Sequence, residues 1–413
     1  MHNQTQHIGK LNDTGSKSTP LDQTHTANRS VVVLLAAIAL FVLTQLYLAI
    51  PLLTHVAQDF GSTNPESVTF ALATSFSLAY ACGFLIWGPI SDQYGRRPVM
   101  LVGLIILSIA TFACSFAPSL SWLAGLRILQ GLAASSFAPI ALAYLTEALP
   151  VRHRATAIGT MSTSFLVAGI FGQVLAAWIV LRWNWVWIFI ATGGCLTVAI
   201  PLFAAMVKEP QRAVVDGHLG HRFVALGRII VRPAVLLLSC AHITLLLSFV
   251  AMYTALGAHL WMLSIAPDKV ILLRLIGLPG MFAALLVGPL SARFSMPIIS
   301  IIGYMTAASG LALEAMLSQS LIGIAAGSLI FVTGVALAVP AMITQFGSIA
   351  ASNRGAGMAL NGFILFIGAS IGSLIATGIA NFVTLLVGAA LTLLLAAFCV
   401  AGSASLTSSL KKP

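Results

Sequence analysis

Four ionisable side chains lie inside long apolar stretches of this chain, where an ionised group is costly unless it finds a partner or water. They are Arg127, His242, Arg274 and Glu314. The two arginines could hold an anionic substrate, and His242 could carry a proton near neutral pH. Arg274 and Glu314 are expected at similar depth, so they form either a structural ion pair or a protonation switch. For Arg127 and His242 the alternative is a structural hydrogen-bonding role.

A short charged segment, Gly-Pro-Ile-Ser-Asp-Gln-Tyr-Gly-Arg-Arg-Pro, begins at Gly88 between two of the apolar stretches. Gly88 and Gly95 would allow close helix approach and a tight turn. Asp92 could face the positive N-terminus of a later helix that begins near Gly355, and this contact would latch one side of the molecule. A static turn that sets topology is the alternative. Arg97 is interpreted as a simple positive charge of the loop.

The elements that must carry these residues are membrane-spanning helices. The chain is 59% hydrophobic and 7% charged, with a mean hydropathy of +1.01, whereas a soluble fold needs far more surface charge. Crossing about 30 Å of hydrocarbon takes about 20 apolar residues, and such uniform runs favour helices over barrel strands. The predicted fold class is therefore an all-α membrane protein, with twelve spans over 31–54, 67–89, 99–117, 119–146, 156–181, 186–207, 234–262, 269–290, 297–316, 320–345, 355–379 and 382–405.

The net charge of +10 does not indicate nucleic-acid binding, because the basic residues are sorted by side of the membrane. Sixteen of the 20 lysines and arginines fall in loops and tails on one side, two fall on the other, and two fall inside spans. The positive-inside rule places both termini in the cytoplasm. Most tryptophans independently fall near the opposite span ends, as in an aromatic belt. These are Trp122, Trp178, Trp183, Trp185, Trp187 and Trp261, with Trp87 as the exception.

The chain divides into two similar halves. Gly88-Pro89 recurs as Gly288-Pro289, and Arg154 aligns with Arg354. Parallel halves related by an axis along the membrane normal place a substrate site at their interface. The sequence Leu278-Pro279-Gly280 predicts a kink in the eighth span. The predicted organisation is a disordered cytoplasmic tail 1–30, a six-helix half 31–207, a cytoplasmic loop 208–233, a six-helix half 234–405 and a cytoplasmic tail 406–413.

Two further expectations concern the loop and the cysteines. Residues 223–230 could form a short helix on the membrane surface, or a plain linker. The five cysteines fall in spans without a CxxC pair, so we expect buried packing residues and no metal site. No motif indicates a cofactor.

Two motifs resemble signatures of the major facilitator superfamily. The segment from Gly88 to Arg97 resembles the loop signature G-x-L-A-D-x-x-G-R-[RK]. Arg-Ile-Leu-Gln-Gly from Arg127 resembles R-x-x-Q-G of span four, which is typical of the twelve-span drug/proton antiporter branch. Of that branch's span-five glycine-proline signature this chain keeps Gly169 and Gly172, which we expect to pack helices, but not the proline.

The resemblance implies roles for particular residues. Arg96 should pair with an acid at the inner end of span four, where Glu147 is available. Arg127 should serve in proton coupling or in holding an anionic substrate. Spans one, four, seven and ten should line the cavity, with helix packing as the alternative for each candidate. Those candidates are Gln45, Tyr47, Gln130 and Tyr253.

The expected function is proton-coupled efflux of small lipophilic or drug-like molecules by alternating access. The expected partners are a small-molecule substrate, protons and the lipid bilayer, and the expected state is a monomer in a bacterial inner membrane or plasma membrane. Proton-coupled uptake or export of a metabolite, such as a sugar or an organic anion, is the alternative. A membrane sensor is disfavoured because the chain has no long terminal domain, and the absence of HExxH and GxSxG motifs predicts no enzyme.

Overall fold

The computed structural model describes residues 28–210, 230–349, 354–379 and 381–409. The predicted tails 1–30 and 406–413, and the possible surface helix over 223–230, fall largely outside these ranges. The described residues form helices and short connections, and twelve helices or helix groups are long and apolar enough to cross a membrane. The predicted fold class is therefore confirmed.

The first six spans contain two interrupted helices. A turn at Leu48 divides span one, and Ser135–Phe137 divides span four. In span two a π-helical segment (Phe70–Thr74) joins α3 to α4 without a break. The helices are α1 (Arg29–Tyr47), α2 (Ala49–Asp59), α3 (Pro65–Thr69), α4 (Ser75–Tyr94), α5 (Arg96–Cys114), α6 (Leu120–Ala134), α7 (Ala138–Ala148), α8 (Val151–Val180) and α9 (Val186–Met206).

The last six spans include one broken helix, span eight, where the kink expected at Pro279 is present. There α12 (Pro267–Ile276), α13 (Leu278–Met281), a 3-10 segment (Phe282–Leu286) and α14 (Val287–Ser291) follow one another, because proline interrupts the ladder of helical hydrogen bonds. The other helices are α11 (Pro233–Met262), α15 (Met296–Met316), α16 (Leu321–Ile349), α17 (Arg354–Gly378) and α18 (Phe382–Ser409).

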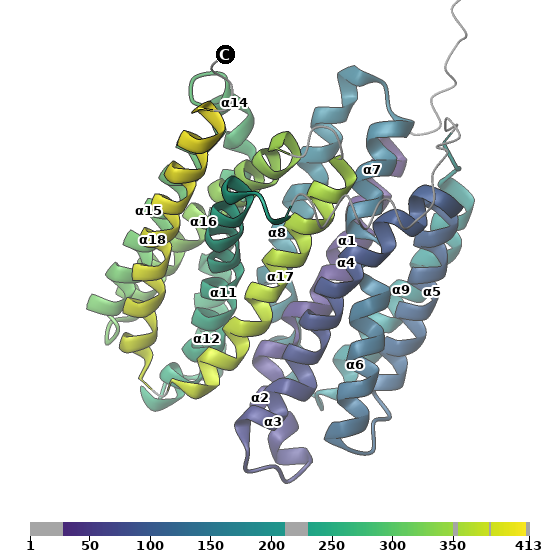
Figure 1. Cartoon of the computed structure of the whole chain (residues 1–413). Helices are drawn as coiled ribbons and strands as arrows, with labels where there is room; N and C mark the ends of the chain where they lie inside the picture. Colours follow the sequence, from purple (N-terminus) through teal and green to yellow (C-terminus); the bar gives the residue numbers. More distant parts are fainter. Residues whose placement is uncertain (1–27, 211–229, 350–353, 380, 410–413) are drawn as a thin grey trace, which may run out of the picture.

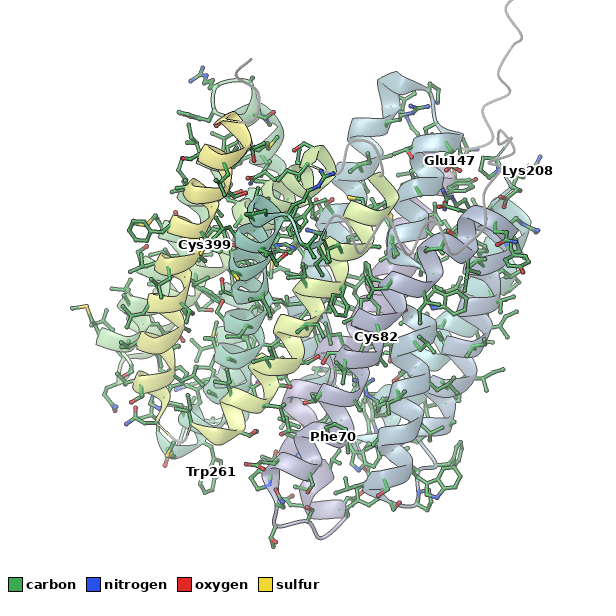
Figure 2. All side chains as sticks on the ribbon, viewed as in Figure 1. Phe70, Cys82, Glu147, Lys208, Trp261 and Cys399 are labelled. Carbon is green, nitrogen blue, oxygen red and sulfur yellow. The ribbon has the colours of Figure 1, made fainter. Side chains whose placement is uncertain are left out.

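The helices form two six-span halves that stand side by side (Figure 1). Helices α1–α9 make up one half and α11–α18 the other. We call the end of the bundle that carries Glu147 and Lys208 the charged end, at the top of Figure 2. The opposite end, which carries Trp261, is the tryptophan end. Exposed indoles gather at the tryptophan end, as in a membrane aromatic belt, at Trp122, Trp178, Trp183, Trp187 and Trp261.

The outer surface of the spans is apolar. Large side chains such as Ile109 on α5 and Phe398 on α18 are 65% and 75% exposed, which suits a protein surrounded by lipid. The expectation of buried cysteines is wrong for three of the five, since Cys82, Cys195 and Cys240 are exposed. A thiol behaves as a small apolar group, so lipid accommodates it as well as the protein interior does.

The two halves touch along two seams, α4 with α17 and α8 with α12 and α13. The yellow-green α17 runs beside the blue α4 in Figure 1. Burial is uneven along the helices that face the seams. Every residue from Val42 in α1 to Ile50 at the start of α2 is buried, whereas Val33 near the charged end is 65% exposed. In α8 only two of the described residues before Ala168 are buried, whereas most residues from Ala168 to Ile179 are. The halves are therefore closed against each other mainly toward the tryptophan end.

Gly88 near the end of α4 and Gly95 between α4 and α5 have different surroundings. Gly95 has φ +117° and ψ 146°, a conformation that residues with a Cβ rarely adopt, so the expected tight turn is present. Close helix approach at Gly88 is not found, because an added Cβ would have no atom within 4 Å. The connection depends on Gly95 and leaves space at Gly88.

This difference predicts the effect of two alanine substitutions. Gly95→Ala should lower the free energy of unfolding by about 1–3 kcal/mol, because the turn would be strained. Gly88→Ala is the matched control and should leave stability within about 0.5 kcal/mol. Thermal unfolding of the purified protein in detergent measures both. An equal loss of stability in the two variants would contradict the assignment of strain to Gly95.

Candidate functional site

A cluster of charges joins the α4–α5 connection to α7 at the charged end. The Arg96 guanidinium makes ion pairs with Asp92 Oδ1 at 2.5 Å and with Glu147 Oε1 at 2.8 Å. It also donates to Ser91 Oγ at 2.6 Å. The pair between Arg96 and Glu147 that the resemblance implied is thus present. The turn is fixed to its own half by charge-assisted hydrogen bonds, which are among the stronger ones.

Glu209, just after α9, caps the first turn of α5. Its two carboxylate oxygens accept hydrogen bonds from the backbone N–H groups of Arg96 at 2.9 Å and Arg97 at 2.7 Å. Arg97 in turn donates to the carbonyls of Val207 at 2.7 Å and Ala204 at 2.9 Å, near the C-terminus of α9. A carboxylate at a helix N-terminus and a cation at a helix C-terminus both complement the helix dipole.

This arrangement corrects the interpretation of Arg97 as a simple loop charge. Arg97 and Glu209 together fasten span three to the end of span six. The sequence analysis missed Glu209 because a single acid after a span has no local signal of its partner. The sequence also predicts a contact between Asp92 and the start of span eleven. That partner comprises residues 350–353 and side chains of the first turn of α17, which lie outside the described part of the chain.

Arg127 is the centre of a polar network buried inside the first half. Its Nε donates to the Leu72 carbonyl at 2.7 Å, Nη1 to Gln130 Oε1 at 2.5 Å and Nη2 to the Gln45 carbonyl at 2.8 Å. Its guanidinium carbon lies 4.3 Å from the centre of the Phe76 ring, a cation–π contact. Carbonyl dipoles and an aromatic face therefore stabilise the positive charge inside the protein. This geometry favours the alternative expectation for Arg127, a structural hydrogen-bonding role.

Two of the four cavity candidates belong to this network. Gln130 Nε2 donates to Gln45 Oε1 at 2.9 Å and to Thr111 Oγ1 at 2.8 Å. The other two, Tyr47 and Tyr253, lie in the interface between the halves. All four are buried, with at most 5% of the side chain exposed. In this conformation these residues pack helices.

His242 on α11 is buried within the second half. The Asn361 amide nitrogen on α17 lies 2.8 Å from His242 Nε2. An amide N–H only donates, so Nε2 accepts and the ring proton of the neutral imidazole is on Nδ1. Nδ1 is buried and has no partner among the described residues. Asn361 was not among the predicted site residues, although it is a polar residue within an apolar span.

Arg274 and Glu314 do not form the predicted ion pair. Arg274 Nη1 donates to Gln173 Oε1 at 2.5 Å, and this hydrogen bond crosses from α12 to α8 in the other half. Both carboxyl oxygens of Glu314 are buried without a partner among the described residues. Glu314 lies where α15 meets α16, against Gly327, whose missing side chain leaves room for it. Similar depth was predictable, but the facing direction of each helix was not.

Aromatic rings line the interface between the halves. Tyr80 on α4 lies 4.5 Å, between ring centres, from Phe366 on α17. Tyr47 on α1 lies 5.8 Å from Phe249 on α11. An added Cβ at Gly169 would be 3.3 Å from the Phe249 ring, so this glycine lets span five approach the other half.

Gly172 packs two helices of the same half. An added Cβ there would be 3.1 Å from the Thr44 carbonyl, so this glycine packs α8 against α1. Hydroxyl pairs join α4 to α17, with Oγ atoms 2.7 Å apart for Ser77 and Ser370. In the part of the chain that the structure describes, no group of three His, Cys, Asp or Glu side chains could hold a metal ion.

The arrangement of spans and motifs has a direct counterpart among known proteins. Residues 35–373 match the family model of the Major Facilitator Superfamily. The chain belongs to the Major Facilitator Superfamily. This membership agrees with the twelve apolar helices of a multi-pass membrane protein.

Individual relatives match less than half of the chain. The multi-drug resistance efflux pump PmrA of Streptococcus pneumoniae is 29% identical over 169 residues, 40% of this chain and 42% of PmrA. The inner membrane transport protein YnfM of Escherichia coli is 30% identical over 177 residues, 43% of this chain and 41% of YnfM. The gallate transporter of Pseudomonas putida is 35% identical over 133 residues, 32% of this chain and 29% of that protein. Each alignment thus spans less than half of the relative.

A solved structure supports the fold over nearly the whole chain. It is a bacterial homolog of the human lysosomal transporter Spinster, with a TM-score of 0.63 and 16% sequence identity. The alignment covers 91% of this chain and 98% of that one. At this identity the likeness establishes the architecture of the superfamily.

The cap on α5 predicts a loss of stability that a neighbouring charge does not share. Glu209→Gln should lower the free energy of unfolding by about 1–2 kcal/mol, because one of two carboxylate acceptors becomes an amide and the charge at the helix N-terminus is lost. Lys208→Gln is the matched control, since Lys208 is adjacent and exposed. Thermal unfolding in detergent checks both. A larger effect of Lys208→Gln would refute the cap.

Proposed function

We propose that this transporter exports small lipophilic molecules in exchange for protons, by alternating access. The observation that carries the proposal is the aromatic interface between the halves, where Tyr80 meets Phe366 and Tyr47 meets Phe249. Apolar and aromatic walls with a few polar groups are typical of sites for lipophilic ligands. When the halves rock apart at one end, these rings are the surfaces that become available to a substrate.

The charged end is proposed to be cytoplasmic, because loops at that end carry most of the basic residues. With this orientation, the contacts between the halves lie mainly on the outer side, and the conformation faces inward. A monomer in a bacterial inner membrane or plasma membrane, with both termini inside, fits this arrangement. Exposed apolar surface around the bundle would contact lipid.

The charged cluster is proposed to be a conformational gate. Asp92, Arg96 and Glu147 lie where α4 reaches the charged end, with Gly88 in the last turns of α4 and Gly95 at its C-terminus. In the present conformation these charges are bonded within one half. We propose that closing the charged end brings Asp92 to the start of α17, so that the cluster stabilises the outward-facing state.

The coupling proton is proposed to bind a group inside the spans. His242 has a buried nitrogen without a described partner, and so has Arg274; Glu314 has two such oxygens. Arg127 has acceptors for each of its guanidinium nitrogens, which favours a positioning role. An anionic substrate is the second candidate, supported by the two buried arginines and by the likeness to a gallate transporter.

Transport by the purified protein in liposomes tests the proposal. With a pH-sensitive dye inside and an imposed proton gradient, lipophilic compounds should cause proton flux, and sugars should not. Asp92→Asn should reduce the flux at least tenfold if the gate operates, whereas Glu66→Gln, an exposed acid at the other end of span two, should leave it unchanged. Flux with organic anions alone would favour the second candidate, and substrate movement without proton flux would exclude coupling.

A buried hydroxyl at the interface gives a separate prediction about the substrate. Tyr80 Oη is buried without a partner among the described residues, so Tyr80→Phe should leave stability unchanged or raise it. If Tyr80 meets the substrate, the same variant should raise the apparent KM for compounds with a hydrogen-bonding group by about tenfold. Tyr304→Phe is the control, because its hydroxyl donates to the Ala241 carbonyl at 2.8 Å and its loss should lower stability. Unaltered transport by Tyr80→Phe would remove Tyr80 from the site.

A further inference from the structure

A single charged hydrogen bond holds the halves together on the side of spans five and eight. Among the described residues, three side-chain hydrogen bonds cross between the halves, and two of them are hydroxyl pairs between spans two and eleven. The third runs from Arg274 Nη1 to Gln173 Oε1. Arg274 Nε is buried without a described partner, so the guanidinium has spare hydrogen-bonding capacity in this conformation.

Glu314 lies near the tryptophan end in a surrounding that does not suit a negative charge. It is fully buried, and neither carboxyl oxygen has a described partner. Leaving a carboxylate in an apolar interior without hydrogen bonds is far costlier than leaving a neutral carboxyl there. In this conformation Glu314 therefore carries its proton. Two residues further along, Met316 ends α15 and is 82% exposed, so solvent or the lipid headgroups begin within one helical turn.

Tyr253 lies between the surroundings of Glu314 and those of Arg274. It is fully buried, and its hydroxyl lies 3.2 Å from Oγ of Ser328, which follows the Gly327 that packs against Glu314. An added Cβ at Gly277 would be 2.5 Å from the Tyr253 hydroxyl, which places this hydroxyl against span eight just after Arg274. A change of charge at Glu314 is therefore felt at the helix that makes the cross-half bond.

The other elements around Glu314 add little charge. Helix α16 contains no ionisable residue, and α18 contains only Cys399, more than four turns from its start at the tryptophan end. On α11, His259 is 2.8 Å from the Ser318 carbonyl and stacks on Phe382. On α12, Lys269 is exposed. Arg274 is thus the buried cation that a carboxylate at Glu314 would attract.

We propose that Glu314 is a proton-binding site that controls closure of the tryptophan end. While the carboxyl group holds its proton, Arg274 stays bonded to Gln173 and keeps α12 against α8. When the proton leaves to water at the tryptophan end, the carboxylate attracts the Arg274 guanidinium and the bond to Gln173 is released. Gln173 acts as a positioning residue for Arg274. The inference rests on the alternating access proposed above, but it does not require that this proton be the transported one.

Infrared difference spectroscopy of the protein in lipid tests the linkage without transport. A protonated carboxyl band should be present at neutral pH, titrate as the pH rises, and be absent in Glu314→Gln. Gln173→Met keeps the size of the side chain but removes the acceptor, so the closed state loses its bond. Proton binding should then weaken about tenfold and the midpoint should fall by about one pH unit. Gln345→Met is the matched control, because Gln345 is a buried glutamine that bonds to Ser300 within one half.

Each spectroscopic outcome bears on the proposal. A midpoint that falls in Gln173→Met and not in Gln345→Met supports it. Equal midpoints in the two variants, or no band assignable to Glu314 at any pH, would overturn it. If Gln173→Met does not fold, Gln173→Asn serves the same purpose, since its amide is one methylene shorter and does not reach Arg274 in the same way.

A distance measurement tests the closure itself. Spin labels at Thr63 and Asn381 would report on the two halves at the tryptophan end, in a variant without the five native cysteines. Raising the pH should shift the distances to longer values in the parent protein and leave them short in Glu314→Gln. The same distances in both at every pH would contradict the proposal. Proton-coupled transport that survives in Glu314→Gln would leave the proposed function standing while the pH response is lost.

Discussion

Inside a bundle surrounded by lipid, every polar group has to find its partner within the protein, and this constraint organises the structure. Arg127 shows how it is met: two backbone carbonyls, a glutamine and an aromatic face surround one guanidinium. The network needs α1, α6 and the start of span two in fixed positions. It therefore makes the first half a rigid body, which is what a rocking mechanism requires of each half.

The same constraint acts differently where the partner lies in the other half. The bond between Arg274 and Gln173 satisfies a buried cation only while α8 and α12 touch. The hydroxyl pairs between spans two and eleven likewise depend on contact between the halves. Polar contacts within a half stabilise the fold, whereas polar contacts across the interface stabilise one conformation. In the alternating access proposed above, these groups would need new partners when the halves separate, because an unpaired group in the membrane is costly.

At the charged end, ionic contacts hold the helices of the first half together, as apolar packing does in the middle of the bundle. Arg96 and Arg97 lie next to each other, yet one bonds to acids of α4 and α7 and the other to carbonyls at the end of α9. Glu209 binds the backbone of both. The connection between spans two and three is thereby fastened at three points. A fastened connection transmits movement of α4 to the rest of its half.

Composition and the length of the apolar runs were sufficient to predict twelve spans, because a bilayer sets the length and polarity of each helix whatever its neighbours are. The two motifs that begin at Gly88 and Arg127 predicted the superfamily, and Pro279 predicted the break in span eight. The turn at Gly95 was also predictable, since its conformation is local. The partners of the buried side chains could not be predicted from the sequence. A span is apolar all round, so its sequence does not show which face meets another helix and which meets lipid. Only the packed structure decided that Arg274 faces Gln173 instead of Glu314, that Gly88 has open space, and that Cys240 is exposed.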